Sequence, residues 1–372
     1  MSHSQKKRWT HHLIEQEEQL LPSEHKLGRQ LRKVAQAKDR SKYKKTDQKR
    51  AEPPPKGPLK RGRVITIVPE GIMVNFENKM YRCTLKGVLK KEKTLAKNLV
   101  AVGDFVLFEI APDHEGVIAY VEPRRSVLER ADNLSRKKRH LIAANVDRVF
   151  ITASVVHPPL KPPLIDRYII AAKKGNMMPI ILINKVDLLD IDNDPLIDEE
   201  RTLFKQCLES YRKAGIPLYP ISAHTGKGIG DLKHLMQDNV SVFSGQSGVG
   251  KSSLINAATG LELQTGEITE KTRKGAHTTT YSQLLPLSFG GFCVDTPGIR
   301  SFGLWNLQRD EIDAYFTEIF EVGKECHFPN CSHTHESDCA VQRAVEEGAL
   351  SSLRYASYTT LLEKTEQKHF RR

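Results

Sequence analysis

Residues 245–252 read G-Q-S-G-V-G-K-S, which is the spacing of a loop that wraps phosphate groups. Gly245 and Gly250 let the backbone turn so that its N–H groups point inward. Lys251 is expected to reach the β and γ phosphates, and Ser252 to offer its hydroxyl to Mg²⁺. A strand-like run precedes this loop and a helix-like run follows it. The expected phosphate-binding residues are Gly245, Gln246, Ser247, Gly248, Val249, Gly250, Lys251, Ser252 and Ser253.

A second motif, D-T-P-G at residues 295–298, ends the apolar run G-F-C-V. Phosphate-loop enzymes hold Mg²⁺ with a carboxylate at the tip of a neighbouring parallel strand, often through water. We therefore expect Asp295 to face the metal and Gly298 to present its backbone N–H to the γ-phosphate. One of Thr278 and Thr279 should also ligate Mg²⁺ and sense the γ-phosphate.

Residues 184–187 read N-K-V-D after the apolar run M-P-I-I-L-I. One aspartate can accept from both N1–H and the N2 amino group of guanine, a donor pair that adenine lacks. Alone, N-K-V-D could be a turn after a strand. Combined with I-S-A at 221–223 and the phosphate loop, it indicates a GTP site. Its expected base-binding residues are Asn184, Lys185, Val186, Asp187, Ser222 and Ala223.

Three cysteines and three histidines gather between residues 326 and 339. Three thiolates and one imidazole suit tetrahedral Zn²⁺ with no open position, so this site should be structural. Cys326, Cys331, His333 and Cys339 give the spacing C-x4-C-x-H-x5-C, with His327 and His335 as competing ligands. The other cysteines are Cys83, Cys207 and Cys293; they lie in apolar runs and are expected to be reduced core residues, which fits the cytoplasm.

Five short strand-like runs follow one another between residues 61 and 122, separated by Gly, Asn or Asp. They predict a small five-stranded barrel of the OB type. Basic residues are frequent over residues 79–97, near Phe76 and Tyr81. Because basic groups follow phosphates and aromatic rings stack on bases, we expect this region to contact RNA. In the alternative interpretation, the two aromatic residues fill the barrel and the lysines only protect an edge.

From residue 140 onward, strand-like and helix-like runs alternate. Helices are expected over 163–175 and about 196–214, with strands at 145–154, 178–184, 216–223, 241–245 and 291–296. This alternation predicts an α/β domain with a mostly parallel sheet and helices on both faces. The section after about residue 305 is expected to be helical around the Cys/His cluster.

The charge of the 372-residue chain is unevenly distributed. Residues 1–63 carry 18 Lys and Arg against 7 Asp and Glu, a formal charge of +11 within a total of +12. Such an asymmetric basic tail suggests an anionic polymer partner, and a solvated extension without a partner is the alternative. No apolar run reaches the roughly 18 residues that a membrane-spanning helix needs, and the N-terminus lacks a secretory apolar segment. A monomer without a membrane partner is expected.

The motifs resemble those of the TRAFAC GTPases, but their order is circularly permuted. Here N-K-V-D and I-S-A precede the phosphate loop, H-T-T-T and D-T-P-G. A permuted G domain between a barrel and a Cys/His cluster resembles the ribosome small-subunit-dependent GTPase family (RsgA/YjeQ). The runs R-R-S-V-L-E-R-A-D, G-A-H-T-T-T and D-T-P-G-I-R-S-F-G-L also look like that family. The resemblance covers about residues 61–365, and Ala276 departs from it, standing where a basic residue is expected.

Residues 1–60 are expected to form a basic, disordered extension, because they contain few large apolar residues, and they depart from the family. For the rest of the chain the resemblance implies a domain order, beginning with the OB-type domain over residues 61–123. Residues 124–304 form the permuted G domain, and residues 305–372 the helical zinc-binding domain. The family spacing favours His333 as the fourth zinc ligand. In this family the permuted order places D-T-P-G near the C-terminal end of the G domain. This order implies that the switch can pull directly on the zinc domain that follows as the nucleotide changes.

The catalytic group is the least determined part of the site. Many GTPases place a Gln after D-x-x-G to orient the attacking water, whereas this chain has Ile299 there. We therefore expect slow hydrolysis by the chain alone, with His277 positioning water as the family implies. His277 could instead only structure its loop.

The leading functional hypothesis is a GTPase that binds the small ribosomal subunit and its rRNA and assists late maturation. GTP would favour binding, and hydrolysis to GDP, stimulated by the subunit, would favour release. Its cofactors would be Mg²⁺ with GTP and one structural Zn²⁺. The alternative is a GTP-dependent RNA-binding switch whose hydrolysis is incidental. A signalling GTPase with a protein partner is a third class, against which the basic tail and barrel count.

Overall fold

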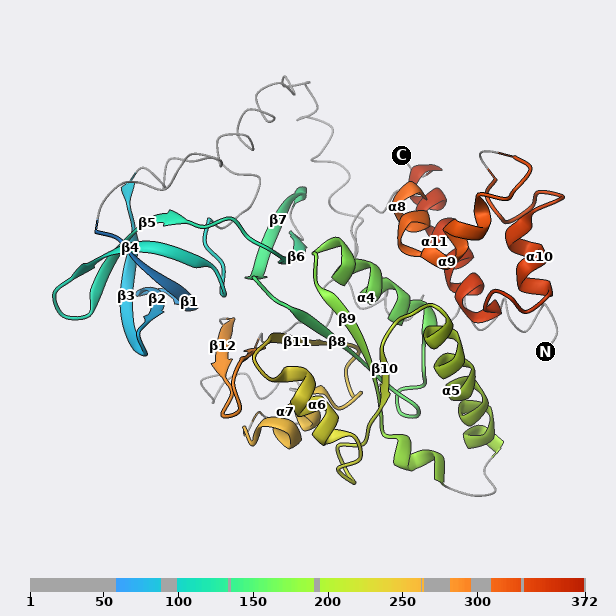
Figure 1. The fold of residues 1–372 in the computed structure, drawn as a ribbon, viewed down its shortest axis with the longest axis horizontal. Coiled ribbons are helices and arrows are strands. Elements are labelled where there is room, and N and C mark those ends of the chain that lie inside the picture. The colour runs from blue at the N-terminus through green and yellow to red at the C-terminus, as the bar shows by residue number, and fades with distance from the viewer. Residues whose placement is uncertain are drawn as a thin grey trace, which may run out of the picture. The chain divides into compact units, whose positions relative to one another are not determined.

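The computed structural model describes residues 58–87, 99–132, 135–190, 195–261, 263, 282–295, 309–328 and 331–370 (Figure 1). The extension expected over residues 1–60 lies outside these ranges except for its last three residues. Within them, no helix is both long and apolar enough to cross a membrane.

The first five strands form a closed barrel. They are β1 (Lys60–Val68), β2 (Gly71–Phe76), β3 (Lys79–Leu85), β4 (Phe105–Ala111) and β5 (Glu115–Val121). Their order is β1-β2-β3-β5-β4, and β4 returns to pair with β1. Pairing is antiparallel except between β3 and β5. Alternate apolar residues such as Val64, Val74 and Phe108 are fully buried inside. The predicted five-stranded barrel is therefore confirmed.

The two aromatic residues expected to stack on RNA belong to the barrel interior. Tyr81 is 8% exposed, and Phe76 packs against the same apolar cluster. The Tyr81 ring centroid lies 5.5 Å from that of Phe108 and 6.3 Å from that of Phe76. The expectation that Tyr81 stacks on bases is wrong, because its ring is already covered by protein. Residues 88–98, with most of the lysines, lie outside the described residues.

A six-stranded α/β sheet follows the barrel, in the order β10-β9-β8-β11-β13-β12. Its strands are β8 (Arg148–Ser154), β9 (Met178–Asn184), β10 (Leu218–Pro220), β11 (Val240–Ser244), β12 (Gln283–Pro286) and β13 (Phe292–Asp295). All are parallel except β12, which runs antiparallel to β13. The run of six buried residues in β8 fits a strand covered on both faces.

Helices cover both faces of this sheet. On one face, α4 (Pro162–Lys174) and α5 (Pro195–Lys213) pack against alternate β8 residues, including Val149 and Ile151. On the other, α6 (Ile229–Met236) and α7 (Lys251–Thr259) pack around Phe150. A short 3-10 helix, η4 (Val186–Asp190), follows β9. The predicted α/β layering is confirmed.

Strand β1 of the barrel also extends the α/β sheet. Thr66 pairs with Gln283 of β12, and its hydroxyl donates to the Ser282 carbonyl at 3.1 Å. The guanidinium of Arg63 lies 4.9 Å from the ring centroid of Phe105 and 5.0 Å from that of Phe292, one ring from each side of the junction. A two-stranded hairpin, β6 (Val127–Asp132) with β7 (Ser135–Ala144), links the two parts along the chain. Neither this hairpin nor β12 was predicted from the sequence.

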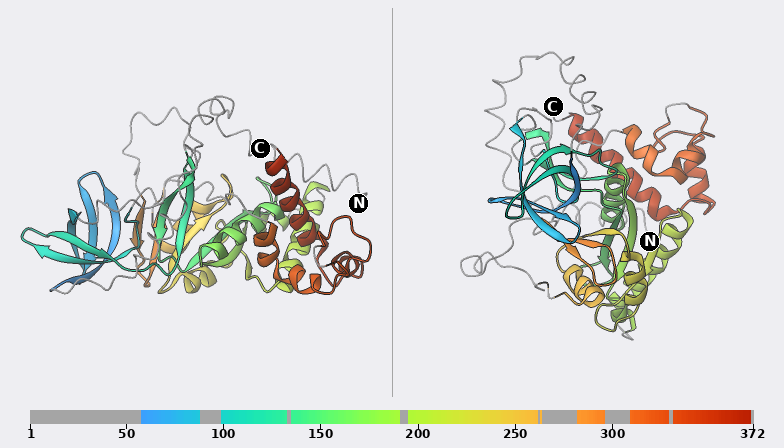
Figure 2. Two further views of the ribbon diagram at one scale, coloured as in Figure 1. Left: turned by 90° about the horizontal axis from the view of Figure 1, so that it is seen from above. Right: turned by 60° about the vertical axis from the view of Figure 1, so that its left-hand side comes forward.

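The C-terminal part is helical, as predicted. It contains α8 (Arg309–Tyr315), α9 (Thr317–Gly323), α10 (Ala340–Glu346) and α11 (Ser352–Phe370). Helix α11 packs against α4 (Figure 2). Ile170 of α4 belongs to the same apolar cluster as Phe316 and Tyr358. Here Arg354, 2% exposed, pairs with buried Asp166 of α4 and with Glu318 of α9.

Candidate functional site

The phosphate-binding loop joins β11 to the first turn of α7, so its N–H groups and the positive end of the helix dipole meet at one place. Gly245 (φ +147°) passes so close to β8 that a Cβ there would lie 2.0 Å from the Thr152 carbonyl oxygen. Gly250 (φ +91°) lies similarly close to the amide of Asn184. Two positions of the motif thus require glycine because of their neighbours.

The amine of Lys251 folds back over this loop. It donates to the carbonyl oxygens of Gly245 at 2.8 Å and Gln246 at 2.6 Å. Its Nζ is therefore held above the loop, where an anion cradled by the backbone N–H groups would meet a positive charge. Ser252 follows in the first turn of α7.

The N-K-V-D motif starts on the last residue of β9, beside the phosphate loop. Asn184, 2% exposed, donates from Nδ2 to the Val249 carbonyl at 2.8 Å. Its Oδ1 accepts the N–H of Ala223 at 3.1 Å. Asn184 therefore ties together the three motifs that come from residues 184–187, 221–223 and 245–252.

The two charged members of this motif differ in their contacts. Lys185 (φ +65°) donates to the carbonyl of His157, and burial lowers its pKa although the nearby Asp187 raises it. Oδ1 of Asp187 is buried and has no hydrogen-bond partner among the described residues. Because a buried carboxylate oxygen without a donor is costly, this atom is available to accept a hydrogen bond from a ligand.

Asp295 ends β13, which pairs in parallel with β11, the strand that leads into the phosphate loop. Burial raises the pKa of Asp295, and a hydrogen bond from Gln283 at 3.5 Å counteracts this shift. A nearby cation would favour its charged form. The other expected ligands and the expected catalytic residue lie outside the described residues; they are His277, Thr278, Thr279 and Gly298.

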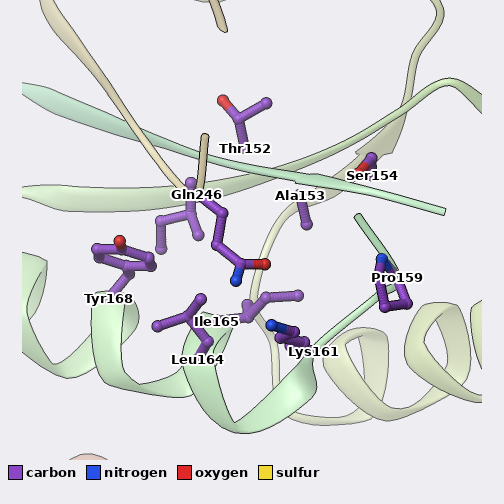
Figure 3. A pocket seen from close by; sticks show the side chains of 10 residues that line it. Thr152, Ala153, Ser154, Pro159, Lys161, Leu164, Ile165, Tyr168 and Gln246 are labelled. Carbon is purple, nitrogen blue, oxygen red and sulfur yellow. The ribbon is translucent and has the colours of Figure 1, made fainter. Parts of the chain in front are cut away.

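A small cavity lies between the phosphate loop, the end of β8 and the first turn of α4. Figure 3 shows Gln246 extending into it toward Lys161, with Tyr168 and Leu164 on the helix side. The sequence does not predict this shared cavity, because nothing in the motif spacing relates residue 246 to α4. Helix α4 therefore lies next to the phosphate-binding loop on one side and the C-terminal helices on the other.

The four expected zinc ligands converge, although they span 14 positions of the sequence. The ligand atoms of Cys326, Cys331, His333 and Cys339 all lie within 4.8 Å of one another. Sγ of Cys326 is 3.8 Å from Sγ of Cys339, and Nδ1 of His333 is 3.5 Å and 3.4 Å from those two sulfurs. A tetrahedron with Zn–S of about 2.3 Å and Zn–N of about 2.0 Å requires separations of about 3.8 Å and 3.5 Å.

The chemistry of this cluster also fits a cation. Burial raises the pKa of the Cys331 thiol to about 12, and also raises that of Cys339. Thiols so close together can all become thiolates only with a positive ion between them. The residues therefore fit a metal ion of the zinc type. Cys83, Cys207 and Cys293 are free and buried, as predicted.

The chain was compared with known families and proteins. Residues 61–118 match the RsgA N-terminal domain, and residues 121–305 match the RsgA GTPase. A protein of Bacteroides fragilis (strain YCH46) named small ribosomal subunit biogenesis GTPase RsgA is 38% identical over 84% of this chain and 99% of its own. A protein of the same name from Chlorobaculum parvum is 43% identical over 73% of this chain and 86% of its own.

Two solved structures share the architecture. YjeQ from Thermotoga maritima is 31% identical, with a TM-score of 0.66 over 82% of this chain and 98% of that one. YloQ, described as a circularly permuted GTPase, is 28% identical, with a TM-score of 0.64 over 83% of this chain and 96% of that one. Together with the motif order and the three structural parts, these matches establish the relationship. The chain is a GTP-hydrolysing enzyme that belongs to the RsgA family of circularly permuted GTPases.

Proposed function

We propose that this protein binds the small ribosomal subunit in the cytoplasm, assists its late maturation, and hydrolyses GTP to GDP and phosphate faster when bound to the subunit. The observation that carries the nucleotide part is the meeting of three motifs at Asn184. The relatives named small ribosomal subunit biogenesis GTPase support the choice of partner. We further propose that the protein acts as a monomer.

In this proposal the backbone N–H groups of residues 245–253 cradle the phosphates, and Lys251 neutralises their charge. Lys251 would move from the Gly245 and Gln246 carbonyls to a phosphate, exchanging two neutral acceptors for an anionic one. Ser252, Asp295 and one of Thr278 and Thr279 would hold Mg²⁺, which offsets the charge developing on the transferred phosphoryl group.

Asp187 would select the base. Its buried Oδ1, which has no donor among the described residues, supports this assignment. Guanine offers two N–H groups to this carboxylate, whereas adenine would leave it unpaired. Ser222 and Ala223 would lie beside the base in this proposal, and the hydrogen bond from the Ala223 N–H to Asn184 supports this position because it joins their loop to the N-K-V-D motif.

His277 would position the attacking water, because Ile299 replaces the usual Gln and has no hydrogen-bonding group. We expect His277→Ala to remove most subunit-stimulated turnover while GTP binding stays within about twofold. Steady-state phosphate release and binding of a fluorescent GTP analogue measure the two quantities. Stimulated turnover that survives in H277A would show that His277 only orders its loop.

We propose that Zn²⁺ occupies the cluster formed by Cys326, Cys331, His333 and Cys339 and stabilises the C-terminal helices. The three separations among Cys326, His333 and Cys339, which match a tetrahedral ion, support this role. With four protein ligands the ion would have no position for substrate, so it would not take part in hydrolysis.

The decisive experiment measures GTP turnover with and without purified small subunits. Stimulation of tenfold or more supports the proposal. GTP-dependent binding to subunits without stimulation would instead favour an RNA-binding switch whose hydrolysis is incidental, which Ile299 favours. Absence of both effects would contradict the choice of partner.

A further inference from the structure

The turn that carries His333 has an unusual backbone. His333 has φ +60°, in the left-handed region that residues other than glycine rarely adopt. Its ring nevertheless points Nδ1 at two cysteine sulfurs, 3.5 Å and 3.4 Å away. A metal ligand held in a strained turn needs surrounding contacts that keep the turn in place.

The carboxylate of Glu336 supplies those contacts. Its Oε1 accepts the N–H of Ser332 at 2.6 Å, and its Oε2 accepts the N–H groups of Thr334 at 3.2 Å and His335 at 3.1 Å. Two of these donors flank His333 directly. Bonds from backbone N–H groups to an ionised carboxylate are stronger than neutral ones, so three of them fix the turn.

Two other contacts hold the rest of His333. The hydroxyl of Tyr355 donates to the His333 carbonyl at 2.5 Å. The ring lies against Gly323, where a Cβ would come within 3.0 Å of Nε2. Both contacts come from other elements, α11 and α9. Neither reaches the N–H donors of the turn, which are left to Glu336.

We propose that Glu336 is a positioning residue for the metal site: its carboxylate folds the turn over residues 332–335 and thereby aims Nδ1 of His333 at the three thiols. Glu336 does not itself belong to the ligand cluster. Its role is therefore to shape the site before the metal arrives. This inference rests on the proposed binding of zinc.

The test uses the full-length protein and the variant Glu336→Gln, which keeps the side-chain shape but turns an NH₂ group toward backbone donors. The control is Glu321→Gln, in the same domain, which removes only an exposed pair with Lys324. Zinc affinity is measured by competition with a chromophoric chelator. The geometry of the site is followed through the visible spectrum after replacement of zinc by Co²⁺.

We expect E336Q to bind zinc about 10- to 100-fold more weakly, as supporting contacts of metal ligands typically do. The Co²⁺ bands of a tetrahedral three-sulfur, one-nitrogen site should shift or weaken, whereas E321Q matches the natural chain. Unchanged affinity and spectrum in E336Q would overturn the role of Glu336 and leave the zinc assignment standing. A natural chain without zinc affinity would overturn both.

A second variant guards against a general loss of folding. Glu336→Asp keeps the charge but is one methylene shorter, so its zinc affinity should lie between those of the natural chain and E336Q. GTP binding reports on the remaining fold in each variant. If E336D binds zinc no better than E336Q, the charge of the carboxylate is not what holds His333.

Discussion

Asp187 combines two properties that a packing residue would not need, a carboxylate and a buried oxygen without a donor among the described residues. Its neighbour Asn184 satisfies both ends of its amide within the protein. Asn184 therefore holds the loops together, whereas Asp187 has the free acceptor that the proposed base recognition requires. The role proposed for Asp187 comes from the motif alone, because N-K-V-D has a local chemistry that can be interpreted without knowing the fold.

Replacing Asp187 by Asn tests the selection of guanine. The Asn amide replaces one of the two acceptor oxygens by an NH₂ group, which would face an N–H donor of guanine, so GTP affinity should fall on the order of 100-fold or more. Xanthosine triphosphate should gain affinity, because xanthine carries an oxygen that the Asn amide can donate to. Competition binding with both nucleotides measures this exchange, and Asp198→Asn on the exposed part of α5 is the control. Equal losses for both nucleotides would point to a structural role.

Some contacts could not have been predicted at the scale of residues. Glu336 accepts hydrogen bonds within its own turn, but its proposed role depends on the three cysteines that the fold brings close to His333. Gln246 meets α4 only because β8 and β11 are neighbours in the sheet. Such contacts follow from the three-dimensional arrangement, and no single motif contains them.

At the scale of elements, the sequence predicted the apolar runs well, but it missed the charged strand β7 and the short strand β12. The runs of β8, β9 and β11 and the helices α4 and α5 fall where periodicity placed them. Strand β7 begins S-R-K-K-R-H, which lacks apolar alternation, and β12 has only four residues. Both depend on a paired neighbour for their conformation, so their own side chains carry little signal.

Helix α4 joins the GTPase sheet to the C-terminal helices through a buried ion pair. Arg354 and Asp166 are 2% and 0% exposed, and their positions in the chain are 188 residues apart. Arg354 also donates to Glu318 at 2.7 Å and lies 4.3 Å from the centroid of the Phe316 ring. Removing one partner would leave a buried charge without compensation.

We therefore expect Arg354→Met to lower the free energy of unfolding by about 3–5 kcal/mol. The double variant R354M with Asp166→Leu should recover much of that loss, because it leaves no unpaired charge at Asp166. Lys213→Met, which breaks the exposed pair with Glu209, should cost less than about 1 kcal/mol. Denaturant titration measures all three. A loss of under about 1 kcal/mol in R354M would contradict the assigned weight of this pair.

At the scale of the whole molecule, the excess basic charge and the nucleotide and metal motifs lie in different parts of the sequence. The first 63 residues carry +11 of the total +12, whereas the motifs for nucleotide and metal lie after residue 180. The described barrel begins at Lys60, so a chain starting at residue 58 keeps β1 intact. The basic extension can therefore be removed without cutting a described strand.

Removing residues 1–57 should weaken binding to small subunits and flatten its dependence on salt. For every phosphate group that the extension neutralises, its removal should reduce the slope of log affinity against log salt by about 0.7–0.9. Binding assays between low and physiological salt compare the two chains, with GTP turnover in the absence of subunits as the control. An unchanged slope would show that the extension neutralises no phosphate groups.

The shared packing around α4 has a consequence for how the protein melts. Ile170 belongs to the apolar cluster of the C-terminal helices, while Ile165 and Tyr168 of the same helix belong to the GTPase core. Neither the C-terminal helices nor the GTPase core can unfold without exposing one side of α4. The two parts should therefore form one cooperative unit. Heating should abolish nucleotide binding and zinc retention at the same temperature. If zinc occupies the cluster as proposed, a chelator that strips it should lower the temperature at which GDP is released, although the cluster belongs to the C-terminal helices and not to the GTPase core.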